Sequence, residues 1–105
     1  MPIIRDGGRF GAPGGDAHYV EHLRSADLSV GTYSIPVGAV DGQTPHAEDE
    51  IYVVTAGRAT FVDADGTVEV SAGDVIFVVA GAEHRFTDVT EDLSLAVIFA
   101  PPESG

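Results

Sequence analysis

The feature that most constrains the fold is a succession of short apolar runs, rich in β-branched residues, that are separated by turn signals. One run, Val75–Val79, is continuously apolar, and the pair Asp65-Gly66 lies between two apolar runs as in a β-hairpin. No segment shows the period of an amphipathic helix. The spacing predicts an all-β sandwich or barrel of about eight strands, which we expect at His18–Arg24, Leu28–Ile35, Ile51–Thr55, Ala59–Val62, Thr67–Val70, Val75–Val79, His84–Thr87 and Leu93–Phe99.

The length and the distribution of glycine predict one domain with an arm before it. A chain of 105 residues fits a single core. Residues 1–16 are rich in glycine and carry no strand pattern, so we expect a flexible N-terminal arm there and the barrel domain in residues 17–105.

Charge and cysteine content exclude several classes of partner and site. The net charge is −12 at pH 7, with only 5 Lys and Arg, which disfavours nucleic acid and anionic membranes as partners. With no cysteine, a metal would need His, carboxylate or amide ligands. The sequence shows no signal peptide and no long apolar stretch, so we expect a cytoplasmic protein.

The apolar strand Val75–Val79 also bears on the oligomeric state. Its side chains alternate between two faces, with Ile76 and Val78 on one face and Val75, Phe77 and Val79 on the other. A small barrel cannot bury both faces of its strands by itself. We therefore expect a homodimer formed through one sheet.

The segment that carries chemistry precedes the strand at Ile51–Thr55. If the chain is extended there, His46, Glu48 and Glu50 lie on one face, and imidazole beside carboxylates suits a metal. A solvated acidic turn is the alternative interpretation of the same residues.

The spacing within residues 38–57 resembles the first motif of the cupin family, G-x5-H-x-H-x3,4-E-x6-G. Glu50 is followed by six residues and Gly57, as in the second half of that motif. His46 falls on the second histidine of the motif, and Thr44 stands where the first histidine would be.

The second cupin motif, G-x5-P-x-G-x2-H-x3-N, is matched further along the chain. Gly73, Gly81 and His84 keep their places in it, while Val79 replaces the proline and Asp88 replaces the asparagine. Two motifs in the right order are far more specific than one. The chain is therefore identified as resembling a small single-domain cupin.

This resemblance implies a cupin double-stranded β-helix, a jelly-roll-like antiparallel barrel whose interior binds one divalent transition metal. Carried over by position, the metal ligands are His46, Glu50 and His84. Gln43 or Glu48 is the candidate replacement for the missing histidine. The metal would be Fe(II), Mn, Ni or Zn.

Strand alternation suggests which side chains line the cavity. Tyr52 and Val54 share a face with Glu50, Phe86 shares a face with His84, and Tyr33 could join them from a neighbouring strand. Plain core packing is the competing interpretation for these residues.

Three functions follow from the resemblance. Two histidines and one carboxylate with open positions suit a dioxygenase-type enzyme acting on a small organic molecule, and an isomerase or lyase reaction is an alternative. A non-catalytic small-molecule-binding, sugar-binding or sensor cupin is a further alternative. A structural barrel with a vestigial site is the last.

Overall fold

The computed structural model describes residues 1–104, and among them it contains strands, turns and loops but no helix. No helix able to cross a membrane is therefore present in this part of the chain. The strands are β1 (His18–Arg24), β2 (Ser29–Ile35), β3 (Asp49–Asp63), β4 (Gly66–Ser71), β5 (Val75–Val78) and β6 (His84–Ala100). The expected all-β architecture is confirmed.

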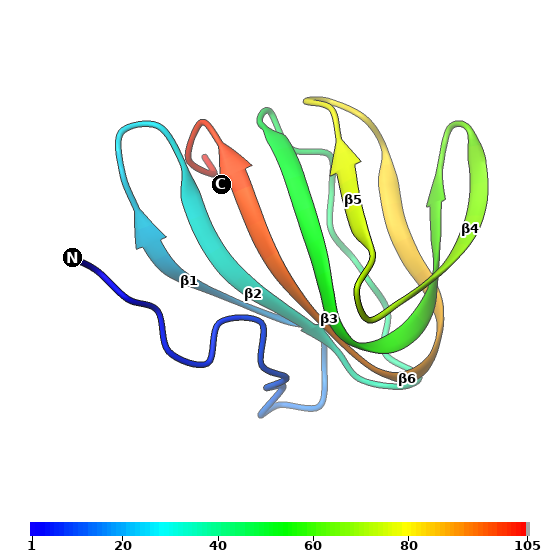
Figure 1. Cartoon of the computed structure of the whole chain (residues 1–105). Helices are drawn as coiled ribbons and strands as arrows, with labels where there is room; N and C mark the ends of the chain where they lie inside the picture. The colour runs from blue at the N-terminus through cyan, green and yellow to red at the C-terminus, as the bar shows by residue number, and fades with distance from the viewer. Residues whose placement is uncertain (105) are drawn as a thin grey trace.

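All six strands belong to one antiparallel sheet that curls around a single core (Figure 1). The strand order is β1-β2-β6-β3-β4, and β5 pairs with β3 beside this path. The long strands β3 and β6 pair with each other along most of their lengths and form the spine of the barrel. The C-terminal half of β6 also pairs with β2, the N-terminal part of β3 pairs with β5, and the C-terminal part of β3 pairs with β4.

The expectation of about eight strands was wrong, because two pairs of expected strands are continuous. Ile51–Thr55 and Ala59–Val62 both lie in β3, while His84–Thr87 and Leu93–Phe99 both lie in β6. The intervening residues, which have the character of turns in the sequence, form β-bulges. The β3–β6 register shifts three times between Val54 and Thr60. Such bulges bend a strand without ending it.

Gly57 lies at the centre of these bulges. Its φ is +94°, and a Cβ at this position would be 2.2 Å from the carbonyl oxygen of Asp92 on β6. Only glycine allows both this conformation and this close approach of two backbones. Asp88 on β6 also has a positive φ, +49°, where two extra residues separate Thr87 from Glu91 in the register.

The core lies on the concave face of the sheet. Side chains alternate along β3, so that Glu50, Tyr52 and Val54 point inward while Ile51 and Val53 point outward. The buried hydrophobic cluster is completed mainly from β2 and β6, by residues such as Tyr33, Ile35, Phe86, Leu93, Leu95, Val97 and Phe99.

The N-terminal arm, for which the sequence predicts flexibility, runs along the convex face of the sheet. The backbone N–H of Gly8 donates to Thr32 Oγ1 at 2.8 Å, and that of Gly11 donates to Ser34 Oγ at 3.0 Å. The hydroxyl of Thr55 donates to the carbonyl oxygen of Gly8. Residues 8–11 of the arm are thus attached to β2 and β3.

Candidate metal and ligand site

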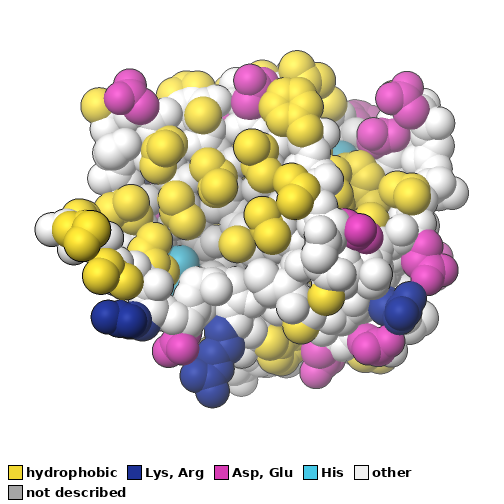
Figure 2. Space-filling model, in the orientation of Figure 1, with side chains coloured by type: hydrophobic (Ala, Val, Ile, Leu, Met, Phe, Trp, Pro, Cys, Tyr) yellow, Lys and Arg dark blue, Asp and Glu magenta, His cyan; other side chains and the backbone are white. Residues whose placement is uncertain are grey.

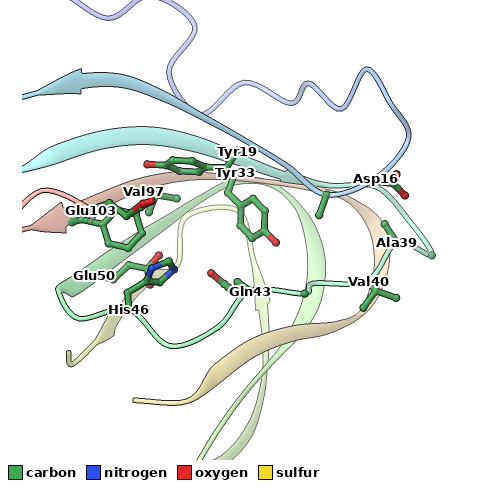
Figure 3. A pocket seen from close by; sticks show the side chains of 14 residues that line it. Asp16, Tyr19, Tyr33, Ala39, Val40, Gln43, His46, Glu50, Val97 and Glu103 are labelled. Carbon is green, nitrogen blue, oxygen red and sulfur yellow. The ribbon is translucent and has the colours of Figure 1, made fainter. Parts of the chain in front are cut away.

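A cavity of about 610 Å³ opens at one end of the barrel (Figure 3). Strands β1, β2, β3 and β6 supply its walls, and the loop 36–48 and the C-terminal tail close its sides. The side chains that matter for its chemistry are Tyr19, Tyr33, Gln43, His46, Glu50, Phe99 and Glu103. Aromatic rings and hydrogen-bonding groups therefore face the same space.

Glu50 and His84 form the buried centre of the site. Their side chains are 2% and 1% exposed, and Glu50 Oε1 lies 3.2 Å from His84 Nε2. Glu50 faces inward because β3 begins at Asp49 and alternates from there. His84 is the first residue of β6, and its Nδ1–H donates to the Ala82 carbonyl at 2.9 Å. This bond fixes the ring so that Nε2 points at Glu50.

The directions of the hydrogen bonds assign the protons around His84. Gln43 Nε2 donates to the Asp41 carboxylate at 3.0 Å, so Gln43 Oε1 must face the other way, towards the Tyr52 hydroxyl at 3.0 Å. The Tyr52 hydroxyl has one proton, and it donates this proton in the hydrogen bond to Gln43 Oε1. Its oxygen, 3.0 Å from His84 Nε2, therefore accepts a hydrogen bond from the N–H at that nitrogen. Both ring nitrogens of His84 carry protons in this arrangement.

The pKa of His84 agrees with that assignment. Burial lowers the pKa, but the neighbouring Glu50 carboxylate and the Ala82 carbonyl outweigh this effect, and the pKa is raised above its usual value. The charged imidazole balances the buried carboxylate. Glu50 Oε1 nevertheless has no partner in hydrogen-bonding geometry, despite its closeness to His84. A buried carboxylate that has an oxygen without a hydrogen-bond partner requires a cation beside it.

His46 lines the same cavity as Glu50 but lies apart from the Glu50–His84 pair, and His84 itself lines a neighbouring pocket instead. Its ring packs edge-on against Phe99, with centroids 4.7 Å apart, and its centroid is 6.4 Å from that of His84. Its backbone carbonyl accepts a hydrogen bond from Gly81 N–H at 2.8 Å. This contact joins the segment of the first motif to that of the second.

The structure does not bring three ligand side chains together in the conformation it shows. Among residues 1–104, no group of three or more His, Asp or Glu side chains is close enough to hold a metal ion. The donor chemistry still fits a divalent transition metal: two imidazoles, one buried carboxylate with an unpartnered oxygen, and one amide oxygen.

Gln43 and Glu48, the two candidate replacements for the missing histidine, have different positions. Gln43 lines the cavity and lies within the network of Tyr52 and Asp41. Glu48 points to the C-terminal tail, where it accepts from Ser104 Oγ at 2.8 Å and Ser104 N–H at 3.3 Å. The alternation expected from His46 to Glu50 fails because residues 47 and 48 form a bend before β3 begins.

Asp41 is an important residue that sequence reasoning missed. Its buried carboxylate accepts hydrogen bonds from Tyr33 Oη at 2.6 Å, from Phe86 N–H at 2.9 Å and from Gln43. It thereby links β2, β6 and the loop that closes the cavity. In the sequence, Asp41-Gly42 is typical of a turn, and no local signal indicates that this side chain is buried.

The expected pocket residues divide into two groups. Tyr33 belongs to the hydrophobic core and also lines the cavity, whereas Tyr52, Val54 and Phe86 lie in the core and line no part of this cavity. Tyr52 reaches the site only through its hydroxyl, which contacts His84 and Gln43. Burial raises the pKa of both Tyr33 and Tyr52, and nearby carboxylates raise it further, so both phenols remain protonated hydrogen-bond donors at neutral pH.

Tyr19 and Glu103 also line the cavity and were not expected from the sequence. The Tyr19 hydroxyl is buried without a hydrogen-bond partner, and its pKa is raised by burial first and by Glu103 second. The backbone N–H of Glu103 donates a hydrogen bond to Ser29 Oγ at 3.0 Å, which attaches the C-terminal tail to β2. Nothing local in the sequence indicates that β1 and the tail meet over the cavity.

Comparison with known proteins decides the family. The family model for the cupin domain matches residues 31–100, which include both motifs, most of β2 and the whole of β3 to β6. The chain belongs to the cupin family. The motif resemblance noted in the sequence is thereby confirmed, and the curled antiparallel sheet is the cupin double-stranded β-helix.

This cupin is similar in sequence to one curated protein and in fold to several solved structures. An uncharacterized protein of Streptomyces coelicolor is 44% identical over 89 residues, which are 85% of each chain. A double-stranded β-helix protein from Klebsiella pneumoniae superposes with a TM-score of 0.82 at 18% identity, over 96% of this cupin and 90% of that chain. The DMSP lyase DddQ from Ruegeria pomeroyi gives 0.75 at 20% identity, over 94% of this cupin and 54% of that chain.

Proposed function

We propose that this cupin is a metal-dependent enzyme that acts on a small organic molecule inside the barrel. His46, Glu50 and His84 would hold one divalent transition metal, Fe(II), Mn, Ni or Zn, with Gln43 beside them. The observation that supports this most is the fully buried Glu50 carboxylate, whose Oε1 has no hydrogen-bond partner and faces His84 Nε2 at 3.2 Å. The cation that this carboxylate requires is a proton on His84 in the metal-free chain and the metal in the loaded protein.

The surrounding residues would support such a site in specific ways. The Ala82 carbonyl, 2.9 Å from His84 Nδ1, orients the ring and increases the basicity of Nε2, as second partners of metal-binding histidines do. Asp41 holds Gln43 by its amide nitrogen and so keeps the amide oxygen turned away towards Tyr52. Tyr33, whose hydroxyl is held by Asp41, stays protonated beside the cavity.

The donor set suggests the reaction class. A bound metal would supply Lewis acidity or a centre for dioxygen, and two histidines with one carboxylate favour the oxygen chemistry of non-haem Fe(II). We therefore favour a dioxygenase-type reaction. A lyase or isomerase reaction is the alternative within the same site, and the likeness to a DMSP lyase, at 20% identity, is a likeness of fold.

Metal content tests the proposal directly. Protein purified without chelators should contain close to one metal ion per chain by elemental analysis. The variants His46→Ala and His84→Ala should lose it. His18→Ala is the matched control, because His18 is exposed on β1 and lines no part of this cavity, and it should keep the metal.

A failure of the wild-type protein to bind metal would contradict the proposal. If wild-type protein takes up no metal after incubation with Fe(II), Mn, Ni and Zn in turn, the metalloenzyme proposal fails. Oxygen uptake by the Fe(II)-loaded protein with candidate substrates then separates the dioxygenase from the lyase and isomerase reactions.

A non-catalytic binding cupin is the second candidate, and the composition of the cavity favours it. Within residues 1–104, Asp16, Glu50 and Glu103 line the cavity and no lysine or arginine does so. Such a lining suits a neutral or cationic molecule rich in hydrogen-bond donors, such as a polyol. Thermal stabilisation of metal-free protein by such compounds, without turnover, would favour this function.

A further inference from the structure

Three aromatic side chains lie close together where strand β1 and the C-terminal tail border the cavity. The Tyr19 ring lies 6.4 Å from that of Tyr33 and 6.2 Å from that of Phe99, measured between centroids. The ring planes meet at 67° and 74°, and all three side chains line the cavity. We call these three rings the aromatic wall. Inclined rings of this kind bind substituted ammonium groups, because the negatively polarised face of an aromatic ring attracts a positive charge.

The position of Tyr19 depends on Gly31 on the neighbouring strand β2. A Cβ at residue 31 would collide with the hydroxyl end of the Tyr19 ring, so the ring occupies the space that a side chain would fill. A glycine inside a strand often marks such a close approach. The Tyr19 hydroxyl is buried there without a hydrogen-bond partner. A ligand in the cavity therefore meets the ring of Tyr19 rather than its hydroxyl.

The carboxylates that line the cavity differ in how their charges are balanced. Glu50 faces His84, whose Nε2 lies 3.2 Å from Glu50 Oε1. Glu103 is half-buried, and within residues 1–104 its carboxylate takes part in no salt bridge. Arg24 contacts the carbonyl oxygen of Glu103, but its guanidinium pairs with the Glu21 carboxylate. The carboxylate of Glu103 therefore borders the cavity without a paired cation.

Glu103 and the aromatic wall share one end of the cavity. Figure 3 shows Glu103 on the same side as Tyr19, whereas Asp16 lies at the opposite end. Burial is the largest cause of the raised pKa of Tyr19, and the Glu103 carboxylate is the next, which places its charge close to this ring. Within residues 1–104 no lysine or arginine lines the cavity, so an anionic ligand would find neither to pair with. A positively charged ligand suits both the rings and the unpaired carboxylate.

We propose that the ligand of this cavity is a small organic cation, whose substituted ammonium group lies against the aromatic wall with Glu103 as its counter-ion. The proposal rests on the proposed function in one respect, that the cavity takes up a small organic molecule, and it needs no metal. A cavity of about 610 Å³ has room for the rest of such a molecule, which would extend towards His46 and Glu50.

Isothermal titration calorimetry with a matched pair of probes tests this proposal. Choline carries a trimethylammonium group, and 3,3-dimethylbutan-1-ol has the same shape with carbon in place of the nitrogen. Wild-type protein should bind choline at least about 10-fold more tightly than the neutral alcohol, because the rings and the carboxylate attract only the cation. Equal affinities for the two probes would overturn the proposal. So would the absence of binding by both choline and the smaller tetramethylammonium ion up to about 50 mM.

A charge-removing variant and its control locate the counter-ion. Glu103→Gln should weaken choline binding by about 5-fold or more and leave the affinity for the neutral alcohol unchanged. Glu69→Gln removes the same charge at an exposed position on β4 that lines no part of the cavity. It accounts for the general attraction of cations to a chain of net charge −12 and should leave choline binding within about 2-fold of wild type. If both variants weakened choline binding equally, Glu103 would not be the counter-ion and the proposal would fail.

Replacing a ring of the aromatic wall gives a second measurement. Tyr19→Leu keeps an apolar side chain but removes the ring, and it should weaken choline binding by about 10-fold with little effect on the neutral alcohol. Circular dichroism should show that the variant is folded. An unchanged affinity for choline in folded Tyr19→Leu would contradict a role for this ring.

The outcome is separate from that of the metal proposal. Choline binding by protein that elemental analysis shows to be free of metal would support the organic cation and leave the metal proposal to fail by itself. Metal binding through His46 and His84 without any preference for choline over the neutral alcohol would have the opposite meaning.

Discussion

At the residue scale, the carboxylate of Asp41 connects segments that are far apart in the sequence. It accepts hydrogen bonds from Tyr33 Oη on β2 and from Phe86 N–H on β6, and it holds Gln43 in the loop between β2 and β3. Through Gln43 the network continues to Tyr52 and His84. The position of Gln43 beside the metal candidates therefore depends on Asp41.

Replacing Asp41 should cost more stability than an ordinary surface substitution. Asp41→Ala leaves the Tyr33 hydroxyl and the Phe86 amide without acceptors in a buried region, and we expect it to lower the free energy of unfolding by about 3 kcal/mol. Urea unfolding measures this as a lower midpoint at an unchanged m-value. Asp27→Ala, at an exposed turn residue, is the control and should change stability by less than about 0.5 kcal/mol. If Asp41→Ala and Asp27→Ala lowered the free energy of unfolding equally, the hydrogen bonds to Asp41 would contribute little to stability.

The same scale shows where local patterns are informative. Alternation correctly placed Glu50, Tyr52 and Val54 on one inward face, because all three lie within β3. The alternation did not extend to Glu48, because the chain bends at residues 47 and 48. Alternation predicts the direction of a side chain only for residues that lie within the same strand.

At the element scale, the bulges of β3 and β6 allow two long strands to bend around the core. The sequence contains the signal for a bend, at Gly57 and near Asp88, but a glycine between two apolar runs is typical of both a turn and a bulge. Only the pairing with the opposite strand distinguishes the two. The expected number of strands was too high for this reason.

Gly57 and Gly73 form a matched pair for alanine substitution, because both have a positive φ but only Gly57 would also produce a steric clash. Their φ angles are +94° and +100°, but a Cβ on Gly57 would be 2.2 Å from Asp92 O, whereas a Cβ on Gly73 would meet nothing within 4 Å. Gly73→Ala should cost about 1 to 2 kcal/mol of stability, from strain alone. Gly57→Ala should cost clearly more, or prevent folding.

Thermal or urea unfolding of both variants measures this difference. A Gly57→Ala variant as stable as Gly73→Ala would mean that the β3–β6 backbones separate easily at the bulge. In that case the bend of these strands would not depend on the absence of a side chain at residue 57.

At the scale of the whole molecule, one sheet has two distinct surfaces. The concave side holds the core, the cavity and the buried Glu50–His84 pair, and the convex side holds the N-terminal arm and several exposed hydrophobic side chains (Figure 2). Strands that are apolar on both faces suit this arrangement, because one face supplies the core while side chains of the other, such as Val75 and Phe77, stay exposed. Most of the acidic side chains are exposed on the rest of the surface, where they favour solubility, whereas Asp41, Glu48 and Glu50 are buried.

The sequence by itself determined the all-β class, the inward and outward faces of the strands, and the place of His84 and Glu50 in the two cupin motifs. These features depend on backbone periodicity and on short spacings, which are local properties of the chain. The tertiary structure decided which distant segments meet: Asp41 with Tyr33 and Phe86, Glu48 with Ser104, and Tyr19 over the cavity. Strand register and loop closure determine those contacts, and neither can be derived from the residues on one side of the contact alone.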